Sequence, residues 1–299
     1  MQCPKCDYLQ ADNRSICENC GIVFAKYQAL QQDIDYAEEL VERHRGQFEL
    51  HSVDPEGWAY LGIGICVGLG LFFMDLWLVQ ATIGALITLI HEMGHAAVSW
   101  LFGAPAMPAF DFRHGGGMTM SFDQRNDILI AIYAAIGYGL YHYRRNGLTL
   151  VILLALLVFH LGFAFSRLSE VFVLFMGHGT ELVIATIFIY RGMSNSAIVH
   201  RIERPMYASI GFYIIFHDIG FAWKLMHDAG YRVEYEAQKG GYHFGDFSRI
   251  AEQHLGTDLS FVAGMFLALC IATPIFAFLL WRYEEAWTDW LHDRISTTV

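Results

Sequence analysis

Charged residues are scarce in this sequence: Asp, Glu, Lys and Arg make up 16% of the 299 residues, against about 25% in soluble domains. Lys and Arg number 19 against 30 Asp and Glu, and no basic patch stands out. This balance argues against nucleic acid as a partner. A secretory signal is also lacking, because the chain opens on a cysteine cluster rather than on a charged segment followed by an apolar one.

Cysteine is scarce as well, and four of the six cysteines lie within the first twenty residues. Cys3 and Cys6, then Cys17 and Cys20, form two Cys-x-x-Cys pairs separated by ten residues. This spacing is typical of a four-cysteine zinc site, and we predict a zinc ribbon over residues 1–21. Two disulfides are the alternative, but nothing in the sequence suggests an oxidising compartment. Four thiolates leave no open coordination position, so this zinc is expected to be structural, with a possible protein partner for the ribbon.

Residues 22–56 are predicted to form an amphipathic helix and linker. Ile22, Phe24, Tyr27 and Leu30 recur at helical spacing, with charged residues between the apolar positions further along the segment. We expect a stalk that packs on the ribbon or lies along a membrane face.

Long apolar runs dominate the rest of the chain, and the hydrophobic content of the whole sequence is 55%. A helix that spans a membrane needs about 20 apolar residues. Seven runs approach that length, the third being the shortest: 58–79, 81–102, 127–143, 147–166, 169–190, 206–226 and 259–281. We therefore predict an all-α polytopic membrane protein with six or seven transmembrane helices over residues 57–299. Loop Lys and Arg leave the orientation open, but the cysteine-rich start favours a cytosolic N-terminus, and we expect a bacterial inner membrane.

The second run contains His91-Glu92-Met93-Gly94-His95, an HExxH motif inside an apolar stretch from Ala81 to Phe102. On a helix, the two histidines lie one turn apart on the same face and can reach one ion. Glu92 lies about 100° round the helix, where it can hold a water molecule instead. Ionisable groups at membrane depth are costly and usually functional. The motif therefore predicts a hydrolytic zinc site with Glu92 as the general base.

A β-hairpin is predicted over residues 109–123, after a Gly/Pro cluster that ends the motif helix. Two stretches of alternating residues flank three consecutive glycines, Gly115 to Gly117. A peptide could add to the edge of this hairpin as an extra strand. Its candidate substrate-guiding residues are Phe112, Gly116, Met118 and Met120.

The motif, with Gly103 and the glycine-containing hairpin after it, resembles the site-2 protease class of intramembrane zinc metalloproteases over about residues 81–122. The resemblance implies hydrolysis of peptide bonds within or beside the bilayer. It also implies that His91 and His95 are zinc ligands, that Glu92 is the base and that the hairpin guides the substrate. That class takes its third ligand from an Asp followed by Gly, with Asn and Pro before it. This sequence has no such copy: His217-Asp218-Ile219-Gly220 is a faint echo, so a distant branch is expected.

The third ligand is chosen among residues of later apolar runs. His178 and Glu181 are three residues apart and share a helix face. A zinc ion with two neutral histidines and one carboxylate carries a charge of +1, against +2 with three histidines, and the smaller charge suits a low-dielectric site. Glu181 is therefore the preferred third ligand. His178 is expected to donate to the developing oxyanion or to bind the metal itself, and Asp218 is the third choice.

The predicted function is that of a zinc-dependent intramembrane endopeptidase with one catalytic and one structural Zn²⁺, acting on membrane proteins or peptides. One alternative is a metal-ion transporter or channel, whose path would run along His91, His95, His178, Glu181, His217 and Asp218. The other is a catalytically inert scaffold in which the ribbon recruits partners. His160 and Asp75 are read as polar groups that tie helices together. The segment 228–258 is read as a polar loop without defined chemistry.

Overall fold

The computed structural model describes residues 1–11, 14–28, 30–32, 55–74, 76–111, 116–194, 197–237 and 245–296. The chain divides into two compact units, Met1–Leu50 and His51–Val299. In the first unit, short bridges pair Gln2 with Leu9 and Ile16 with Val23, and residues 24–28 and 30–32 are helical. The rest of the predicted stalk, residues 33–54, lies outside the described residues.

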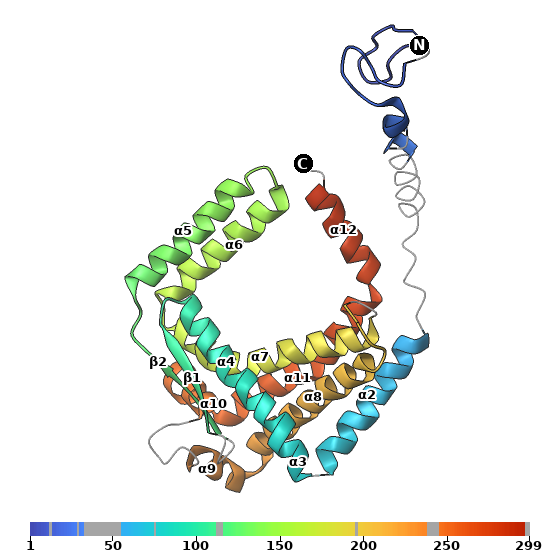
Figure 1. Ribbon diagram of the computed structural model, residues 1–299. Coiled ribbons are helices and arrows are strands. Elements are labelled where there is room, and N and C mark those ends of the chain that lie inside the picture. Colours follow the sequence, from blue (N-terminus) through green and yellow to red (C-terminus); the bar gives the residue numbers. More distant parts are fainter. Residues whose placement is uncertain are drawn as a thin grey trace. The chain divides into compact units, whose positions relative to one another are not determined.

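The described residues of the second unit are mostly helical and include a two-stranded sheet (Figure 1). In chain order its elements are α2 (Pro55–Phe73), α3 (Trp77–Val79), η1 (Gln80–Gly84), α4 (Ala85–Leu101), β1 (Ala106–Asp111), β2 (Gly116–Ser121), α5 (Asn126–His142), α6 (Gly147–Ala164), α7 (Leu168–Met193), α8 (Glu203–His227), α9 (Ala229–Ala237), α10 (Asp246–Arg249), η2 (Ile250–Leu255), α11 (Leu259–Arg282) and α12 (Glu284–Ser296).

Among the described residues, five helices are long and apolar enough to cross a membrane. They are Pro55–Phe73, Trp77–Leu101, Gly147–Ala164, Leu168–Met193 and Leu259–Arg282. The predicted runs 127–143 and 206–226 also fold as helices, α5 and α8, but are not among these five. The α5 helix is short, at 17 residues. The α8 helix contains charged residues at both ends and His217-Asp218 in its middle.

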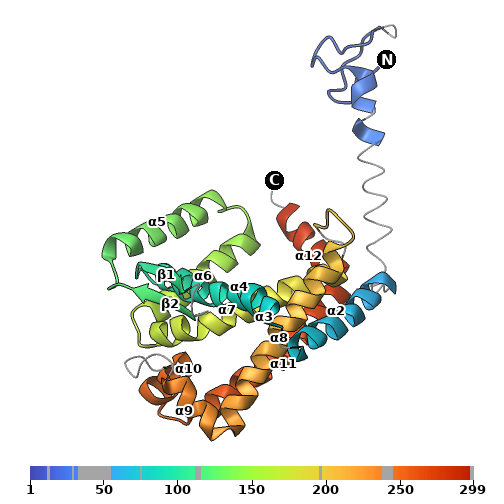
Figure 2. The same cartoon turned by 60° about the horizontal axis from the view of Figure 1, so that its bottom comes forward.

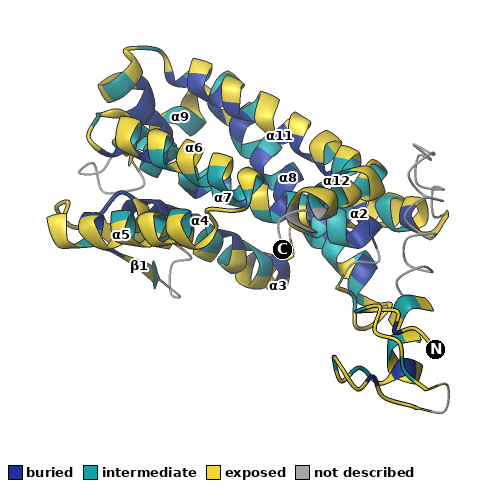
Figure 3. Cartoon of the chain, turned by 90° about the horizontal axis from the view of Figure 1, so that it is seen from above, coloured by how far each residue is buried: buried dark blue, intermediate teal, exposed yellow. Residues whose placement is uncertain are grey.

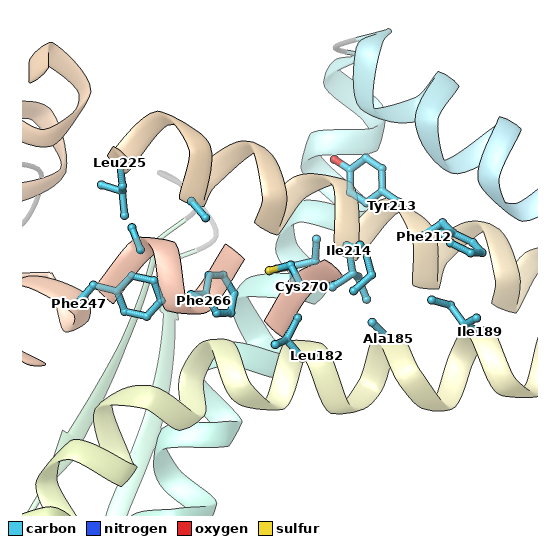
Figure 4. Packing of buried hydrophobic residues seen from close by; sticks show 14 of the residues in the cluster. Leu182, Ala185, Ile189, Phe212, Tyr213, Ile214, Leu225, Phe247, Phe266 and Cys270 are labelled. Carbon is cyan, nitrogen blue, oxygen red and sulfur yellow. The ribbon is translucent and has the colours of Figure 1, made fainter. Parts of the chain in front are cut away.

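The core lies where α7, α8 and α11 pack together (Figure 4). It is lined by Leu182, Ala185 and Ile189 of α7, Phe212, Tyr213 and Ile214 of α8, and Phe266 and Cys270 of α11. The α8 helix also approaches α2 and α7 closely through small residues. A Cβ atom added at Gly64 of α2 or Gly192 of α7 would lie 2.6 or 2.7 Å from the Cβ of Ala208. Such close backbone contacts are typical of helices that associate within membranes.

Many residues of the helical unit are exposed, as the yellow stretches of its helices show (Figure 3), and a large number of them are apolar. On α6, Val151 and Val158 are 65% and 69% exposed. Exposed apolar faces of this extent are unfavourable in water and suit a lipid environment. The buried His160 of α6 ties this helix to its neighbours: one ring nitrogen contacts the Leu101 carbonyl oxygen at 2.7 Å and the other contacts the Tyr133 hydroxyl at 3.0 Å.

The predicted hairpin is present as the antiparallel pair β1 and β2, with Ala106 opposite Ser121 and Asp111 opposite Gly116. Its turn, including Phe112, lies outside the described residues. Both strands lie along α4 (Figure 1). Asp75 also lies outside the described residues.

The prediction of a loop over residues 228–258 was wrong for two stretches of this segment. Residues 229–237 form α9, and residues 246–255 form α10 and the π-helix η2 (Figure 2). The helices are short and separated by a glycine-containing stretch, so no long apolar periodicity reveals them.

Candidate metal centres

The α4 helix places His91 and His95 on one side, as their spacing requires. Their Nε2 atoms lie 3.0 Å apart. Each of these Nε2 atoms also lies 3.2 Å from Oδ2 of Asp246, the first residue of α10. All three side chains are largely buried, with 14%, 9% and 13% of their surface exposed. Three potential ligand atoms from two distant parts of the chain thus surround one point.

The opposite ring nitrogens show which atoms are free to bind. The Nδ1 atom of His95 lies 2.7 Å from the carbonyl oxygen of Val173, which can only accept a hydrogen bond, so this Nδ1 carries a proton. The Nδ1 atom of His91 lies 2.9 Å from Oε1 of Glu181 and donates in the same way. In the neutral rings, both Nε2 atoms therefore present lone pairs toward each other. Two lone pairs at 3.0 Å repel unless a cation or a proton lies between them.

The separations between these three atoms fit a zinc site. Zn²⁺ binds His nitrogen at about 2.0–2.1 Å in tetrahedral geometry, which places two ligand atoms about 3.3 Å apart. The observed separations are 3.0, 3.2 and 3.2 Å. Two imidazoles and a carboxylate are also a usual ligand set for catalytic zinc, because three protein ligands leave a position for water.

Gly177 of α7 forms the wall behind this point. A Cβ atom added at Gly177 would lie 2.5 Å from Nε2 of His95 and 2.6 Å from Nε2 of His91. Any larger residue would therefore displace the imidazoles. Gly94 of α4 allows the same close approach of α4 to α7, since a side chain there would overlap the Met176 carbonyl oxygen.

Glu181, the predicted third ligand, lies behind His91 rather than between the two histidines. Its Oε1 contacts Nδ1 of His91, and its Oε2 lies 2.8 Å from Nδ1 of His178. His91, His178 and Glu181 form a second group of potential ligand atoms, and among the residues that the structure describes His95 belongs only to the group that contains Asp246. The His178 ring packs against Phe221, Phe247 and Phe266 at centroid distances of 4.7–5.0 Å.

Asp218, the other alternative, is fully buried in α8 but belongs to neither group of potential ligand atoms among the described residues. One of its oxygens lies 3.4 Å from Nδ1 of His217. The geometry therefore brings together His91, His95 and Asp246. Glu181 lies on the far side of the His91 ring, and His178 lies next to Glu181.

Asp246 is a candidate ligand that sequence reasoning missed. It lies in the segment read as a loop, and the available signal was weak: an aspartate after Gly245, with Phe247 and Ile250 following at helical spacing. The α9 helix holds it in place. Tyr235 accepts a hydrogen bond from the amide of Phe247 at 3.2 Å, and a side chain at Gly245 would overlap the Tyr235 ring. Burial raises the pKa of Tyr235, so the hydroxyl remains neutral.

Glu92 is 5% exposed, and its Oε2 accepts a hydrogen bond from the hydroxyl of Thr119 on β2 at 2.6 Å. Beside it lies a cavity of about 1350 Å³ between α4, β2, the start of α7 and the α10–η2 segment. Glu92, His95 and Asp246 all line this cavity, together with polar residues that include Glu170 and Arg249. The candidate base and two of the candidate ligands thus line the same cavity.

The four N-terminal cysteines form a separate group whose sulfur atoms lie close together. Cys3 and Cys20 are 3.7 Å apart, as are Cys6 and Cys17. Tetrahedral Zn²⁺ with Zn–S bonds of about 2.3 Å separates its sulfurs by about 3.8 Å, so the spacing is compatible with a metal site. The same backbone turn follows the first cysteine of each Cys-x-x-Cys pair. The amides of Asp7 and Gly21 donate to the carbonyl oxygens of Cys3 and Cys17, both at 2.9 Å.

Hydrogen bonds within this group favour thiolates unequally. The Tyr8 amide and the Asn19 side chain lower the pKa of Cys6 to about 6. At Cys20, the Ile22 amide lowers the pKa, but burial and the three neighbouring sulfurs outweigh it and raise the pKa to about 12. Without a cation the four thiols therefore cannot all ionise at neutral pH, whereas a bound metal would offset the repulsion.

No protein-family model, no curated protein and no solved structure matches this chain.

Proposed function

We propose that this chain is a zinc-dependent intramembrane endopeptidase in which His91, His95 and Asp246 hold the catalytic zinc. The observation that carries the proposal is the convergence of two Nε2 atoms and one carboxylate oxygen, 3.0–3.2 Å apart, at a cavity that the buried Glu92 also lines. The Nδ1 protons of both histidines are engaged elsewhere, so their lone pairs are available to a metal.

Asp246 replaces Glu181 in this proposal, and the charge argument still holds. Zn²⁺ with two neutral histidines and one carboxylate keeps a charge of +1. Glu181 becomes a positioning residue, since it orients His91 through Nδ1 and raises the basicity of the ligand. His178 contacts Glu181 in turn through Nδ1, and in this proposal it supports Glu181 rather than the oxyanion.

The chemistry follows from what each residue can do. Zinc bound here would acidify a water molecule and polarise a peptide carbonyl group. Glu92 accepts the proton of that water and passes it to the leaving amine. The adjoining cavity admits water to the site and gives room for an extended peptide beside β2.

The position of the site supports hydrolysis inside a membrane. The candidate span Trp77–Leu101 contains His91, which lies about 21 Å from one end of that helix and about 15 Å from the other. The HExxH motif and the following hairpin support membership in a distant branch of the site-2 protease class. In this proposal Met118 and Met120, which are exposed, contact the substrate together with Gly116.

Two measurements on the purified full-length protein test the proposal. Metal content by mass spectrometry should give two zinc ions per chain, one of which is lost in Asp246→Ala. Internally quenched peptides with an apolar helical segment should be cleaved in detergent micelles by the wild type and not by Glu92→Gln, which retains both ions. An active Glu92→Gln protein, or full zinc in Asp246→Ala, contradicts the assignment.

Zinc transport is the second candidate, because contacts of 2.9 and 2.8 Å link His91 to Glu181 and Glu181 to His178 inside the helical unit. Such buried ionisable groups also suit an ion path. Uptake of radioactive zinc into proteoliposomes, without any peptide cleavage, would favour it.

A further inference from the structure

The strand β2 rests on α4 through small and polar residues. Its residues Gly117 and Thr119 are partly buried, whereas Met118 and Met120, which alternate with them along the strand, are 49% and 43% exposed. Ser121, the next residue on the inner side, has its hydroxyl 3.3 Å from that of Ser99 on α4. Side chains alternate along a strand, so Gly117, Thr119 and Ser121 share the side that faces α4.

Two of these residues enclose the carboxylate of Glu92. The Thr119 hydroxyl lies 2.6 Å from Oε2 of Glu92 and 3.0 Å from its carbonyl oxygen. A hydroxyl has one proton, and the shorter contact has the length of a charge-assisted hydrogen bond. On the other side, a Cβ atom at Gly117 would lie 2.7 Å from Oε1 of Glu92, so the bare backbone of β2 lies against this oxygen.

We propose that Thr119 is a positioning residue for the general base Glu92, an inference that rests on the proposed hydrolase function. A glutamate side chain has three rotatable bonds, and a base acts only when its carboxylate is held at the right place. Thr119 fixes one carboxylate oxygen through its hydroxyl, and Gly117 restricts the other by contact. The hairpin therefore aims the base in addition to any contact with the substrate.

The alternative is a purely structural role, in which the Thr119 hydroxyl only attaches the hairpin to α4. Ser121 in the same strand provides the control for that role. Ser121 also contacts α4 through a hydroxyl, two residues along, but its partner is Ser99 and not Glu92. Removing either hydroxyl costs one contact between β2 and α4, and only the Thr119 change releases the base.

The test compares Thr119→Val, Thr119→Ser and Ser121→Ala in the full-length zinc-loaded protein. Valine keeps the β-branched shape and the strand preference of threonine but has no hydroxyl. We expect Thr119→Val to lower kcat between about 10- and 100-fold, with KM and zinc content unchanged. Thr119→Ser should restore kcat, and Ser121→Ala should keep it within about twofold of the wild type.

A wild-type kcat in Thr119→Val overturns the inference, as do equal losses in Thr119→Val and Ser121→Ala or a loss of zinc in Thr119→Val. Binding of acetohydroxamate, a small zinc chelator that also hydrogen-bonds to a neighbouring base, provides a readout without substrate. Thr119→Val should weaken this binding about fivefold or more, and Thr119→Ser should not. A wild type without peptidase activity would overturn the proposed function, while the acetohydroxamate result would still decide the role of Thr119.

Discussion

Glu181 accepts a hydrogen bond from Nδ1 of His91 at 2.9 Å, on the opposite side of the imidazole ring from Asp246. The two carboxylates therefore contact the same histidine through different nitrogens, so the proposed ligand Asp246 and the proposed positioning residue Glu181 can be tested separately. This relationship gives the sharpest contrast between variants of the candidate site.

Glu181→Gln should weaken zinc binding at the membrane site about 10- to 100-fold, because the ring of His91 loses a charged acceptor that fixes its tautomer. Asp246→Asn should lose the ion, because an amide is a poor zinc ligand. Competition with chelators of graded affinity measures both effects. Equal affinities in the two variants would contradict the separation of roles.

Gly177→Ala should abolish zinc binding at the same site. The new methyl group would lie within 2.6 Å of the Nε2 atoms of both histidines, at the place proposed for the ion. Gly162→Ala on α6 is the control, since a Cβ atom there meets nothing within 4 Å. Zinc content and helix content of both variants are measured, and a normal zinc content in Gly177→Ala would refute this placement.

Asn19→Ala should make the N-terminal site release metal at a higher pH. The pKa of Cys6 is lowered to about 6, first by the Tyr8 amide and then by the Asn19 side chain, so metal binding by this thiolate is favoured above that pH and lost as the pH falls through it. Removing Asn19 raises this pKa and moves the loss upward. The sulfur-to-cobalt absorption of the Co²⁺-loaded protein reports thiolate ligands alone. Gln28→Ala, which removes an exposed amide further along, should leave the midpoint unchanged.

His160→Leu should destabilise the helical unit by about 1 kcal/mol, within the range measured for hydrogen bonds between membrane helices. The change removes the contacts to the Leu101 carbonyl oxygen and to the Tyr133 hydroxyl, whereas Tyr133→Phe removes only the second. Unfolding in mixed micelles should therefore rank Tyr133→Phe between the wild type and His160→Leu. Equal destabilisation by the two variants would show that the Leu101 contact contributes nothing, and the reverse order would contradict the prediction.

Several features could be predicted from the sequence because they depend on local spacing. The apolar runs, the hairpin and the clustering of the four cysteines are confirmed at this level. The number of spans was predicted as six or seven, and within the part of the chain that the structure describes five helices meet the length and hydropathy required. The α8 helix accounts for part of this difference. Its polar residues lower its hydropathy, although one of them, Asp218, is completely buried by the packing of the helices.

The sequence by itself determined that His91 and His95 share a side of one helix, since residues four apart always do. It also determined that Glu92 lies beside them and that the cysteine pairs can close on one ion. Only the tertiary structure decided that Asp246 meets these histidines across 151 and 155 residues, and that Glu181 and Thr119 lie behind His91 and Glu92. The reason is physical: helical periodicity fixes neighbours within a turn, whereas contacts between distant segments depend on how α4, α7, α10 and β2 pack.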